Sequence, residues 1–191
     1  MAQNLSDMTS KETGMSTEEV EDCVAKYIKK LEHVRYFDFI DLVETLPVKT
    51  KIKDKVIDRY LHNADIYTKY SDVDETLAEL QKIGYRLGIF SEGSPRFQEN
   101  KLNNLKITRY LDKELIFIVQ SKRSEEYVKS LPPSIIVDDN VDICNMLVKF
   151  KQHCIIHLNI EKDKRTTSEK GTQVHGSIRS IDSLKELLDI L

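Results

Sequence analysis

The stretch that most constrains the fold is Arg86-Leu-Gly-Ile-Phe-Ser-Glu-Gly-Ser94. A short apolar run flanked by turn residues is typical of a fully buried strand, and we predict one over residues 86–90. Ser91 then lies at the carboxyl end of this strand, and Gly93 permits unusual backbone angles. Ligands bind just beyond such strand ends in open parallel sheets, where a hydroxyl and free N–H groups suit a phosphate. Many strands end in Ser-x-Gly without a function. The stretch alone is therefore compatible with a purely structural role and with a phosphate-binding role.

Alternating apolar runs and helical patterns fill the rest of the second half of the chain. Further strands are expected over residues 115–119, 135–137 and 154–158. Helices are expected between them and over the terminal residues 183–191, where leucines recur at helical spacing. Near-continuous apolar strands that alternate with helices predict an α/β fold with a Rossmann-like parallel sheet. We place this core at residues 71–191.

The first third of the chain has a different character. Residues 1–15 are polar and contain no strand-like run, so we expect a flexible lead-in. Ser16 and Glu19 form the pattern of a capping box, and three apolar stripes at helical spacing follow. Residues 16–70 are therefore expected to form a small all-helical unit.

Composition excludes several classes of protein. The 191 residues carry a net charge of −3, whereas a nucleic-acid-binding domain needs a basic face. No apolar run is long enough to span a membrane, and the chain does not open with a basic segment followed by an apolar one. Three cysteines without a CxxC pair indicate reduced thiols. We expect a cytoplasmic protein with neither a membrane nor a nucleic-acid partner, and its oligomeric state stays open.

Polar residues follow two of the later strands as well. Lys122 comes after the second strand, and Asp138 and Asp139 close the third, with Asp142 beyond. Adjacent carboxylates repel each other unless a cation intervenes, and Mg²⁺ prefers carboxylate oxygens that it shares with a substrate phosphate. Singly, Lys122 also fits a solvated surface lysine, and Asp138 with Asp139 fit the N-cap and acidic first turn of a helix that begins near Val141. Their order after successive strands favours a joint site for phosphate and Mg²⁺.

With these motifs, residues 72–191 resemble the core of the haloacid dehalogenase superfamily, most of whose members are phosphatases. The segment Gly88-Ile-Phe-Ser-Glu-Gly93 is similar to the family's second motif, and Lys122 matches its third-motif lysine. Ile136-Val-Asp-Asp-Asn140 is similar to the fourth motif, which holds Mg²⁺. The helical unit 16–70 resembles the cap of many members, which act on small phosphorylated molecules.

The resemblance implies a role for each matching residue. Ser91 and Lys122 would be catalytic groups that stabilise the transferring phosphoryl group. The phosphate-binding set implied by the resemblance is Ser91, Glu92, Gly93 and Lys122. The implied Mg²⁺ ligands are Asp138, Asp139 and Asp142.

The family's first motif has no clear counterpart. It is an apolar strand that ends in Asp-x-Asp-x-Thr, and its first aspartate is the nucleophile. Nothing before residue 16 fits this pattern. Asp72-Val-Asp-Glu-Thr76 contains the residues of this motif in the right order. However, helical periodicity runs through these residues, and they are close to Ser91 in the sequence. We therefore interpret them as the first turn of a helix, where the helix dipole favours acidic side chains.

Two functional hypotheses follow. The first is a Mg²⁺-dependent phosphatase of a small phosphorylated molecule, inactive or truncated as given because the nucleophile is missing. The second is a non-catalytic binding or regulatory module on the same scaffold.

The missing motif also bears on the sheet. In the family its strand lies between the strands that would end here at Ser91 and Val137. Without it, these strands either pair directly or leave rows of N–H and C=O groups unpaired in a poorly stable fragment. Each buried unsatisfied group costs about 1–3 kcal/mol, so we expect either direct pairing of residues 86–90 with 135–137 or a poorly stable fragment.

Overall fold

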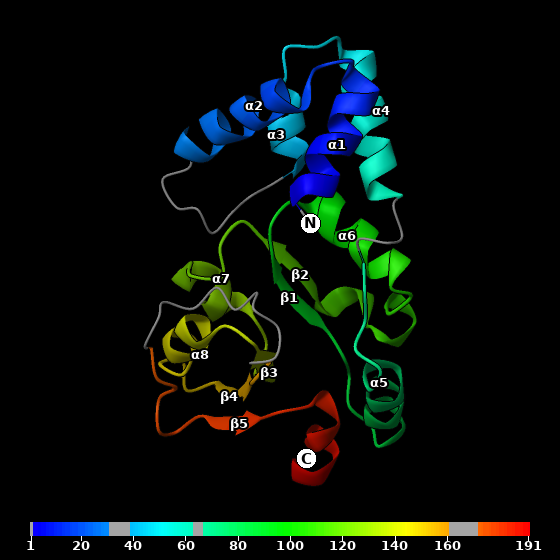
Figure 1. The fold of residues 1–191 in the computed structure, drawn as a ribbon. Helices are drawn as coiled ribbons and strands as arrows, with labels where there is room; N and C mark the ends of the chain where they lie inside the picture. Colours follow the sequence, from blue (N-terminus) through cyan, green and yellow to red (C-terminus); the bar gives the residue numbers. More distant parts are fainter. Residues whose placement is uncertain (1, 31–38, 63–66, 161–171) are drawn as a thin grey trace. The chain divides into compact units, whose positions relative to one another are not determined.

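The computed structural model describes residues 2–30, 39–62, 67–160 and 172–191 (Figure 1). The chain divides into two compact units, one of residues 1–68 and 93–106, the other of residues 69–92 and 107–191. The first is helical, and the second contains parallel strands with helices, so the predicted α/β class is confirmed. Within the described ranges, no helix combines the length and apolar character needed to cross a membrane.

Five helices make up the described part of the helical unit. They are α1 (Ala2–Thr13), α2 (Thr17–Lys30), α3 (Phe39–Thr45), α4 (Thr50–Leu61) and α6 (Pro95–Asn104). The predicted capping box starts α2, because Ser16 Oγ accepts the Glu19 N–H at 3.2 Å and Glu19 accepts the Ser16 N–H at 2.7 Å. The apolar stripes of these helices meet in one core of Tyr27, Phe39, Leu42, Val43, Leu46, Val56, Ile57 and Leu61.

Helix α1 replaces the flexible lead-in that we expected over residues 1–15. Thr9 is buried, and Met8 packs against the core of the unit. The carboxylate of Glu12 lies 2.9 Å from the Lys55 ammonium of α4 and also pairs with Arg59. A short polar helix gives little periodic signal, and tertiary contacts of this kind supply its stability instead.

Helix α6 also departs from the predicted boundary at residues 70 and 71, because it belongs to the helical unit. Leu102 is buried, and the ring of Phe97 stacks on Tyr60 with 5.8 Å between the ring centroids. The side-chain amide of Asn104 donates to the Leu61 carbonyl at 3.2 Å. Apolar and polar contacts thus hold α6 against α4. The order of helices and strands along the sequence does not predict these contacts.

The second unit alternates strands and helices as expected. Its strands are β1 (Ile89–Glu92), β2 (Ile116–Val119), β3 (Ser134–Asp138), β4 (His153–Leu158) and β5 (Arg179–Ile181). Its α-helices are α5 (Val73–Lys82), α7 (Glu125–Ser130), α8 (Val141–Leu147) and α9 (Leu187–Ile190). β1 begins three residues later than predicted, and β5 was not predicted because its three residues are too short for a periodic signal.

Helices cover both faces of the strands. Ile136 and Ile155 pack with α7 and α8, whereas Val137 and Ile156 pack with α5 and α9. Successive strand residues point to opposite faces, so neighbours in β3 and β4 enter different cores. Phe90 of β1 joins the first of these cores. Burial on both faces explains the near-continuous apolar runs in the sequence.

The strands form two separate sheets. β1 pairs with β2, and β3 pairs with β4, which pairs with β5, all in parallel. β1 and β3 share no strand pairing within the described residues, so direct pairing, the first of the two expected alternatives, is not observed. The two sheets are instead joined by side chains.

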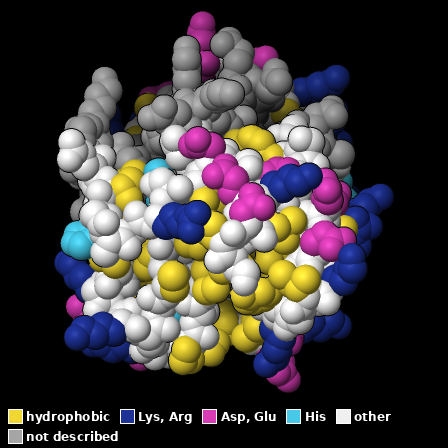
Figure 2. Space-filling model, turned by 90° about the horizontal axis from the view of Figure 1, so that it is seen from below, with side chains coloured by type: hydrophobic (Ala, Val, Ile, Leu, Met, Phe, Trp, Pro, Cys, Tyr) yellow, Lys and Arg dark blue, Asp and Glu magenta, His cyan; other side chains and the backbone are white. Residues whose placement is uncertain are grey.

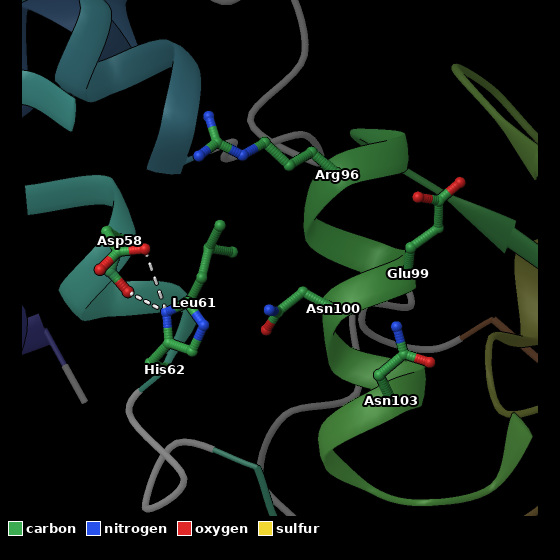
Figure 3. Close-up of a pocket in the computed structure, with 7 residues that line it drawn as sticks. All are labelled: Asp58, Leu61, His62, Arg96, Glu99, Asn100 and Asn103. Atoms are coloured by element: carbon green, nitrogen blue, oxygen red, sulfur yellow. Dashed lines mark hydrogen bonds and ion pairs between the residues drawn. The ribbon is translucent and has the colours of Figure 1, made fainter. Parts of the chain in front are cut away.

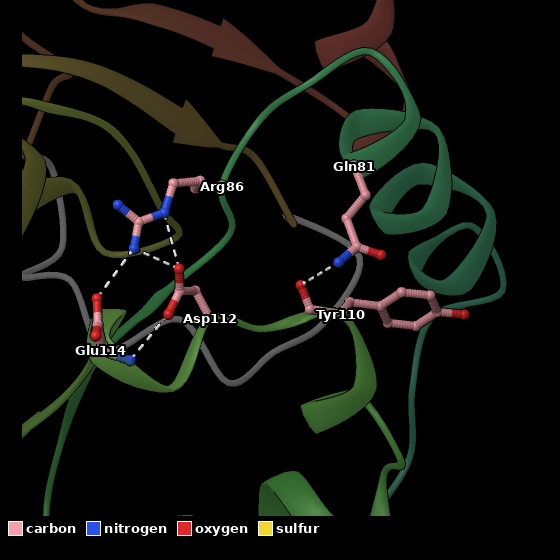
Figure 4. A network of polar contacts seen from close by, with 5 residues as sticks. All are labelled: Gln81, Arg86, Tyr110, Asp112 and Glu114. Atoms are coloured by element: carbon pink, nitrogen blue, oxygen red, sulfur yellow. Dashed lines mark hydrogen bonds and ion pairs between the residues drawn. The ribbon is translucent and has the colours of Figure 1, made fainter.

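A polar network holds the segments that lead into β1 and β2 (Figure 4). The guanidinium of Arg86 donates to the Asp112 carboxylate through Nε at 2.8 Å and through a second nitrogen, which also lies 3.4 Å from Glu114. Hydrogen bonding to Arg86 holds the pKa of Asp112 below its usual range. Gln81 of α5 donates to the Tyr110 carbonyl at 2.9 Å. The start of β1 is therefore fixed to the segment before β2.

Gly88 is the point where these segments approach most closely. A Cβ atom added to Gly88 would lie 2.5 Å from the Leu115 carbonyl oxygen and 2.7 Å from its Cβ. Gly88→Ala should therefore lower the free energy of unfolding by about 1–3 kcal/mol. Gly176→Ala is the control, because an added Cβ there meets nothing within 4 Å. Equal midpoints of the two variants in urea denaturation, followed by circular dichroism, would contradict this close approach.

Candidate functional site

Lys122 brings together the carboxyl ends of β1, β2 and β3 in the second unit. Its ammonium donates to Asp138 Oδ2 at 2.6 Å, and its backbone N–H donates to Glu92 Oε2 at 2.5 Å. Glu92 is the last residue of β1, Asp138 is the last of β3, and Lys122 follows β2 by three residues. Lys122 and Asp138 therefore lie together as expected from their order after successive strands, whereas Glu92 was expected only in the phosphate-binding set.

The Lys122–Asp138 ion pair is largely removed from solvent. The side chain of Lys122 is 18% exposed and that of Asp138 is 4% exposed. The Lys122 ammonium also lies 5.6 Å from the ring centroid of Phe90 in β1, within the range of a cation–π interaction. A buried ion pair adds little net stability, but removing one partner leaves the other charge uncompensated.

The segment after β3 turns directly into α8. Asp138 Oδ1 accepts the Asn140 N–H at 2.9 Å. Asn140 Oδ1 in turn accepts the N–H groups of Asp142 and Ile143 at 3.0 and 3.2 Å, which makes Asn140 the N-cap of the helix. Asn140, and not Asp138 or Asp139, is therefore the N-cap of α8, and Asp142 lies in its first turn.

Negative charge is concentrated at the end of β3. Although part of Asp139 is exposed, desolvation on its protein side and the neighbouring charge of Asp138 raise the pKa of Asp139. The Cys144 thiol donates to the Asp138 carbonyl at 3.4 Å. Burial and both carboxylates raise the pKa of Cys144 to about 12, so this thiol is protonated and unreactive near neutral pH. Two carboxylates face one ammonium here.

The remaining predicted phosphate-binding residues lie at the end of β1. Ser91 is half-buried in the strand, and its hydroxyl makes no hydrogen bond to another described residue. Gly93 has a φ angle of +127°, so the expected unusual backbone conformation is confirmed. The Glu92 carboxylate is used to hold the Lys122 backbone.

The three predicted metal ligands do not form a ready-made metal centre. Across the described ranges, no group of three or more His, Cys, Asp or Glu side chains is placed to hold a metal ion. Both oxygens of Asp138 already accept hydrogen bonds, from Lys122 and from Asn140. Magnesium binding by Asp138, Asp139 and Asp142 therefore stays a prediction.

Sequence reasoning missed two side chains that shape this edge. Phe90 was assigned only to a strand, although its ring lies beneath the Lys122 ammonium. Asn140 was not identified as a cap, although an asparagine just before an apolar helical run is a recognised N-cap signal. The contact of Phe90 with Lys122 depends on tertiary packing and leaves no local signal.

The Asp72–Thr76 box begins α5 rather than ending a strand, as predicted. Asp74 lies in the first turn and its carboxylate is 2.5 Å from the Lys69 ammonium. Asp72 Oδ2 accepts the backbone N–H of Lys185 at 3.2 Å. These contacts give the acidic residues of the box a structural role.

A separate open pocket of about 420 Å³ lies in the helical unit (Figure 3). Residues of α4, the position after it and α6 line it: Asp58, Leu61, His62, Arg96, Glu99, Asn100 and Asn103. His62 Nδ1 lies 3.3 Å from Asp58 Oδ1 and 2.8 Å from the Asp58 carbonyl oxygen. None of the predicted site residues lines this pocket, and its lining mixes charges of both signs. We therefore place the candidate site at the strand ends.

Parallel strands covered by helices, with Lys122 and Asp138 paired at the strand ends, make the second unit a Rossmann-like α/β fold. The family model for haloacid dehalogenase-like hydrolases matches residues 8–123, more than half of the chain. The chain belongs to this family. The match includes Ser91 and Lys122 and ends before the aspartates of β3.

Solved structures agree on the fold. A protein described as a haloacid dehalogenase-like hydrolase from Burkholderia xenovorans LB400 has a TM-score of 0.67 and 14% identity, covering 98% of this chain and 87% of that one. A dehalogenase with an intermediate complex has a TM-score of 0.56 and 19% identity, covering 100% and 91%. No curated protein sequence gives a significant match. Identities this low support the fold alone.

Loss of the Lys122 ammonium should destabilise the chain, because the buried Asp138 carboxylate would lose its partner. Lys122→Ala should lower the free energy of unfolding by about 3 kcal/mol. The control is Lys129→Ala, which removes an exposed ion pair with Glu125 and should change stability by less than about 1 kcal/mol. Urea denaturation of both variants tests this, and equal losses would mean that the Lys122 pair is not buried in solution.

Proposed function

We propose that the strand-end site binds a phosphoryl group together with Mg²⁺, as in a phosphatase-type hydrolase. The observation that carries this proposal is the Lys122–Asp138 contact of 2.6 Å. It joins the residues that follow β2 and end β3 at one edge, where open α/β sheets bind ligands.

The charge of the site supports a divalent cation. Asp138 and Asp139 supply carboxylate oxygens, the ligands that Mg²⁺ prefers, and Lys122 alone does not balance them. Without a further cation this edge would repel a phosphate. A bound Mg²⁺ would offset the excess negative charge and share its remaining positions with phosphate oxygens. The fit requires Asp138 to share an oxygen between Lys122 and the metal.

Ser91 and Lys122 have complementary roles in this proposal. The Ser91 hydroxyl has no hydrogen-bond partner among the described residues and is available as a donor to a phosphate oxygen. The Lys122 ammonium, held by Asp138 and Phe90, would offset phosphate charge. The Glu92 carboxylate would repel phosphate, so its part is to fix the Lys122 backbone.

Turnover is a separate question from binding. A phosphatase of this type needs a carboxylate nucleophile, and we assign none in the described residues. Glu92 and Asp138 are engaged by Lys122, and the Asp72–Thr76 box belongs to α5. We therefore propose that the chain as given binds but does not hydrolyse phosphate esters. The second candidate is a regulatory binding module, and the lack of an assigned nucleophile among the described residues also favours it.

Magnesium binding tests the proposed metal site. Asp139→Asn should weaken Mg²⁺ binding about tenfold or more, equivalent to at least about 1.4 kcal/mol, because Mg²⁺ would lose a charged ligand. Asp189→Asn in α9 and Asp72→Asn in the box are matched controls that should leave the affinity unchanged. Titration calorimetry measures all three. The same Mg²⁺ affinity in Asp139→Asn and in the unmodified chain would exclude Asp139 as a ligand.

Turnover is tested with p-nitrophenyl phosphate and saturating Mg²⁺. We expect no hydrolysis above background, since no nucleophile is assigned at the site. Inorganic phosphate should still bind in the presence of Mg²⁺, and binding should weaken in Ser91→Ala. Hydrolysis that is lost in Asp72→Asn would show that the box supplies the nucleophile after all.

A further inference from the structure

Strand β4 carries two buried histidines that differ in one hydrogen bond. His153 exposes 8% of its surface and His157 exposes 7%. His153 Nδ1 lies 3.0 Å from the Ser134 hydroxyl of β3. His157 Nδ1 lies 3.2 Å from the Ser180 hydroxyl of β5. The second ring nitrogen of His153, Nε2, lies 3.3 Å from the Val128 carbonyl oxygen, whereas His157 Nε2 has no hydrogen-bond partner in the described part of the chain.

The Nε2 atom of His157 reaches solvent. A side-chain nitrogen sealed in the interior without a partner would be a buried unsatisfied polar atom, and across the described ranges Thr76 Oγ1 is the single atom of that kind. The small exposed part of His157 therefore includes Nε2. An imidazole that is buried around its ring and open at one nitrogen is held in place before a ligand arrives, which lowers the entropic cost of binding.

The position of His157 in the sheet brings it to the strand-end site. It stands opposite Asp138 in the ladder of β3 and β4, and opposite residues of neighbouring strands project to the same face. Asp138 accepts the Lys122 ammonium. Burial and the charge of Asp138 raise the pKa of Asp139, and a positive charge on His157 acts in the opposite direction, so the imidazole lies near both aspartates. His153, the first residue of β4, lies at the other end of the strand.

The serine at Nδ1 defines what Nε2 offers to a ligand. Ser180 is exposed, and its hydroxyl can rotate to donate to Nδ1 of His157. The proton of a neutral imidazole then lies on Nε2, which makes this nitrogen a donor for an acceptor oxygen and not a metal ligand. By contrast, the face seen from below gathers hydrophobic side chains in its middle (Figure 2), which suits an apolar contact rather than an anion.

We infer that His157 is a further phosphate-binding residue of the strand-end site, and that its Nε2–H donates a hydrogen bond to an oxygen of the bound phosphoryl group. The inference rests on the proposed phosphate site and adds a donor from β4 to the Ser91 hydroxyl and the Lys122 ammonium. Ser180 acts through the imidazole and is a positioning residue. His153 has a contact at both ring nitrogens and keeps a structural role.

Two substitutions at His157 separate the two ring nitrogens. The side-chain amide of glutamine reaches the position of Nε2, whereas that of asparagine reaches only the position of Nδ1 and replaces the Ser180 contact alone. With saturating Mg²⁺, His157→Asn should weaken the binding of inorganic phosphate about tenfold, because a hydrogen bond to a charged group is lost. His157→Gln should retain most of the affinity. Titration calorimetry measures both, and equal losses in the two variants would contradict the inference.

Controls separate this role from a structural one. His153→Asn, at a residue of similar burial in the same strand, should leave the phosphate affinity unchanged even where it lowers stability. Without phosphate, the Mg²⁺ affinity of His157→Asn should equal that of the unmodified chain. A weaker Mg²⁺ affinity in that variant would show that His157 acts through Asp138 or Asp139, and the inference would be wrong.

The same titrations distinguish this inference from the proposed function. If Ser91→Ala weakens phosphate binding and His157→Asn does not, the role of His157 is wrong and the phosphate site stands. If the unmodified chain binds no phosphate in the presence of Mg²⁺, both are wrong.

NMR on the unmodified chain keeps the test decisive if the variants fail to fold. Long-range proton–nitrogen spectra distinguish the two ring nitrogens of a histidine and report which of them carries the proton. Saturating phosphate with Mg²⁺ should shift the Nε2 resonance of His157 and leave the ring of His153 unchanged. An Nε2 without a proton in His157, or shifts of the same size in both histidines, would overturn the inference.

Discussion

The Lys122–Asp138 ion pair determines how the strand ends of the second unit lie relative to one another. Because β1–β2 and β3–β4–β5 share no backbone pairing in the described residues, side chains must hold the two sheets together. The apolar cores do so over their faces, but they are non-directional. The ion pair, with the Glu92 bond to the Lys122 backbone, fixes the carboxyl ends of three strands relative to one another.

Much of this fold could be predicted from the sequence, because buried strands and amphipathic helices carry periodic patterns. Helix α1 could not, since its stability comes from Glu12 contacts with α4 and not from an apolar stripe. Helix α6 was predicted as a helix but assigned to the wrong unit, because its contacts with α4 are tertiary. A periodic pattern in the sequence predicts which face of a helix is apolar. It does not predict which helix or strand packs against that face.

The candidate site was predictable to the extent that strand ends meet in a parallel sheet. That rule placed Lys122 beside Asp138, and the observed contact agrees with it. It could not assign the Glu92 carboxylate to the Lys122 backbone, since this contact depends on how the segment after β2 turns. Direct pairing of β1 with β3 was one of two expected alternatives, and it is not seen among the described residues, where side chains join the two sheets instead.

The ion pair also links the stability of the second unit to its proposed chemistry. Lys122 reaches from the end of β2 to Asp138 and lies over the Phe90 ring, and its backbone N–H is held by Glu92. A cation that took an oxygen of Asp138 would therefore compete with the contact that fixes these strand ends. Metal binding and the stability of the second unit would then be coupled through the same carboxylate.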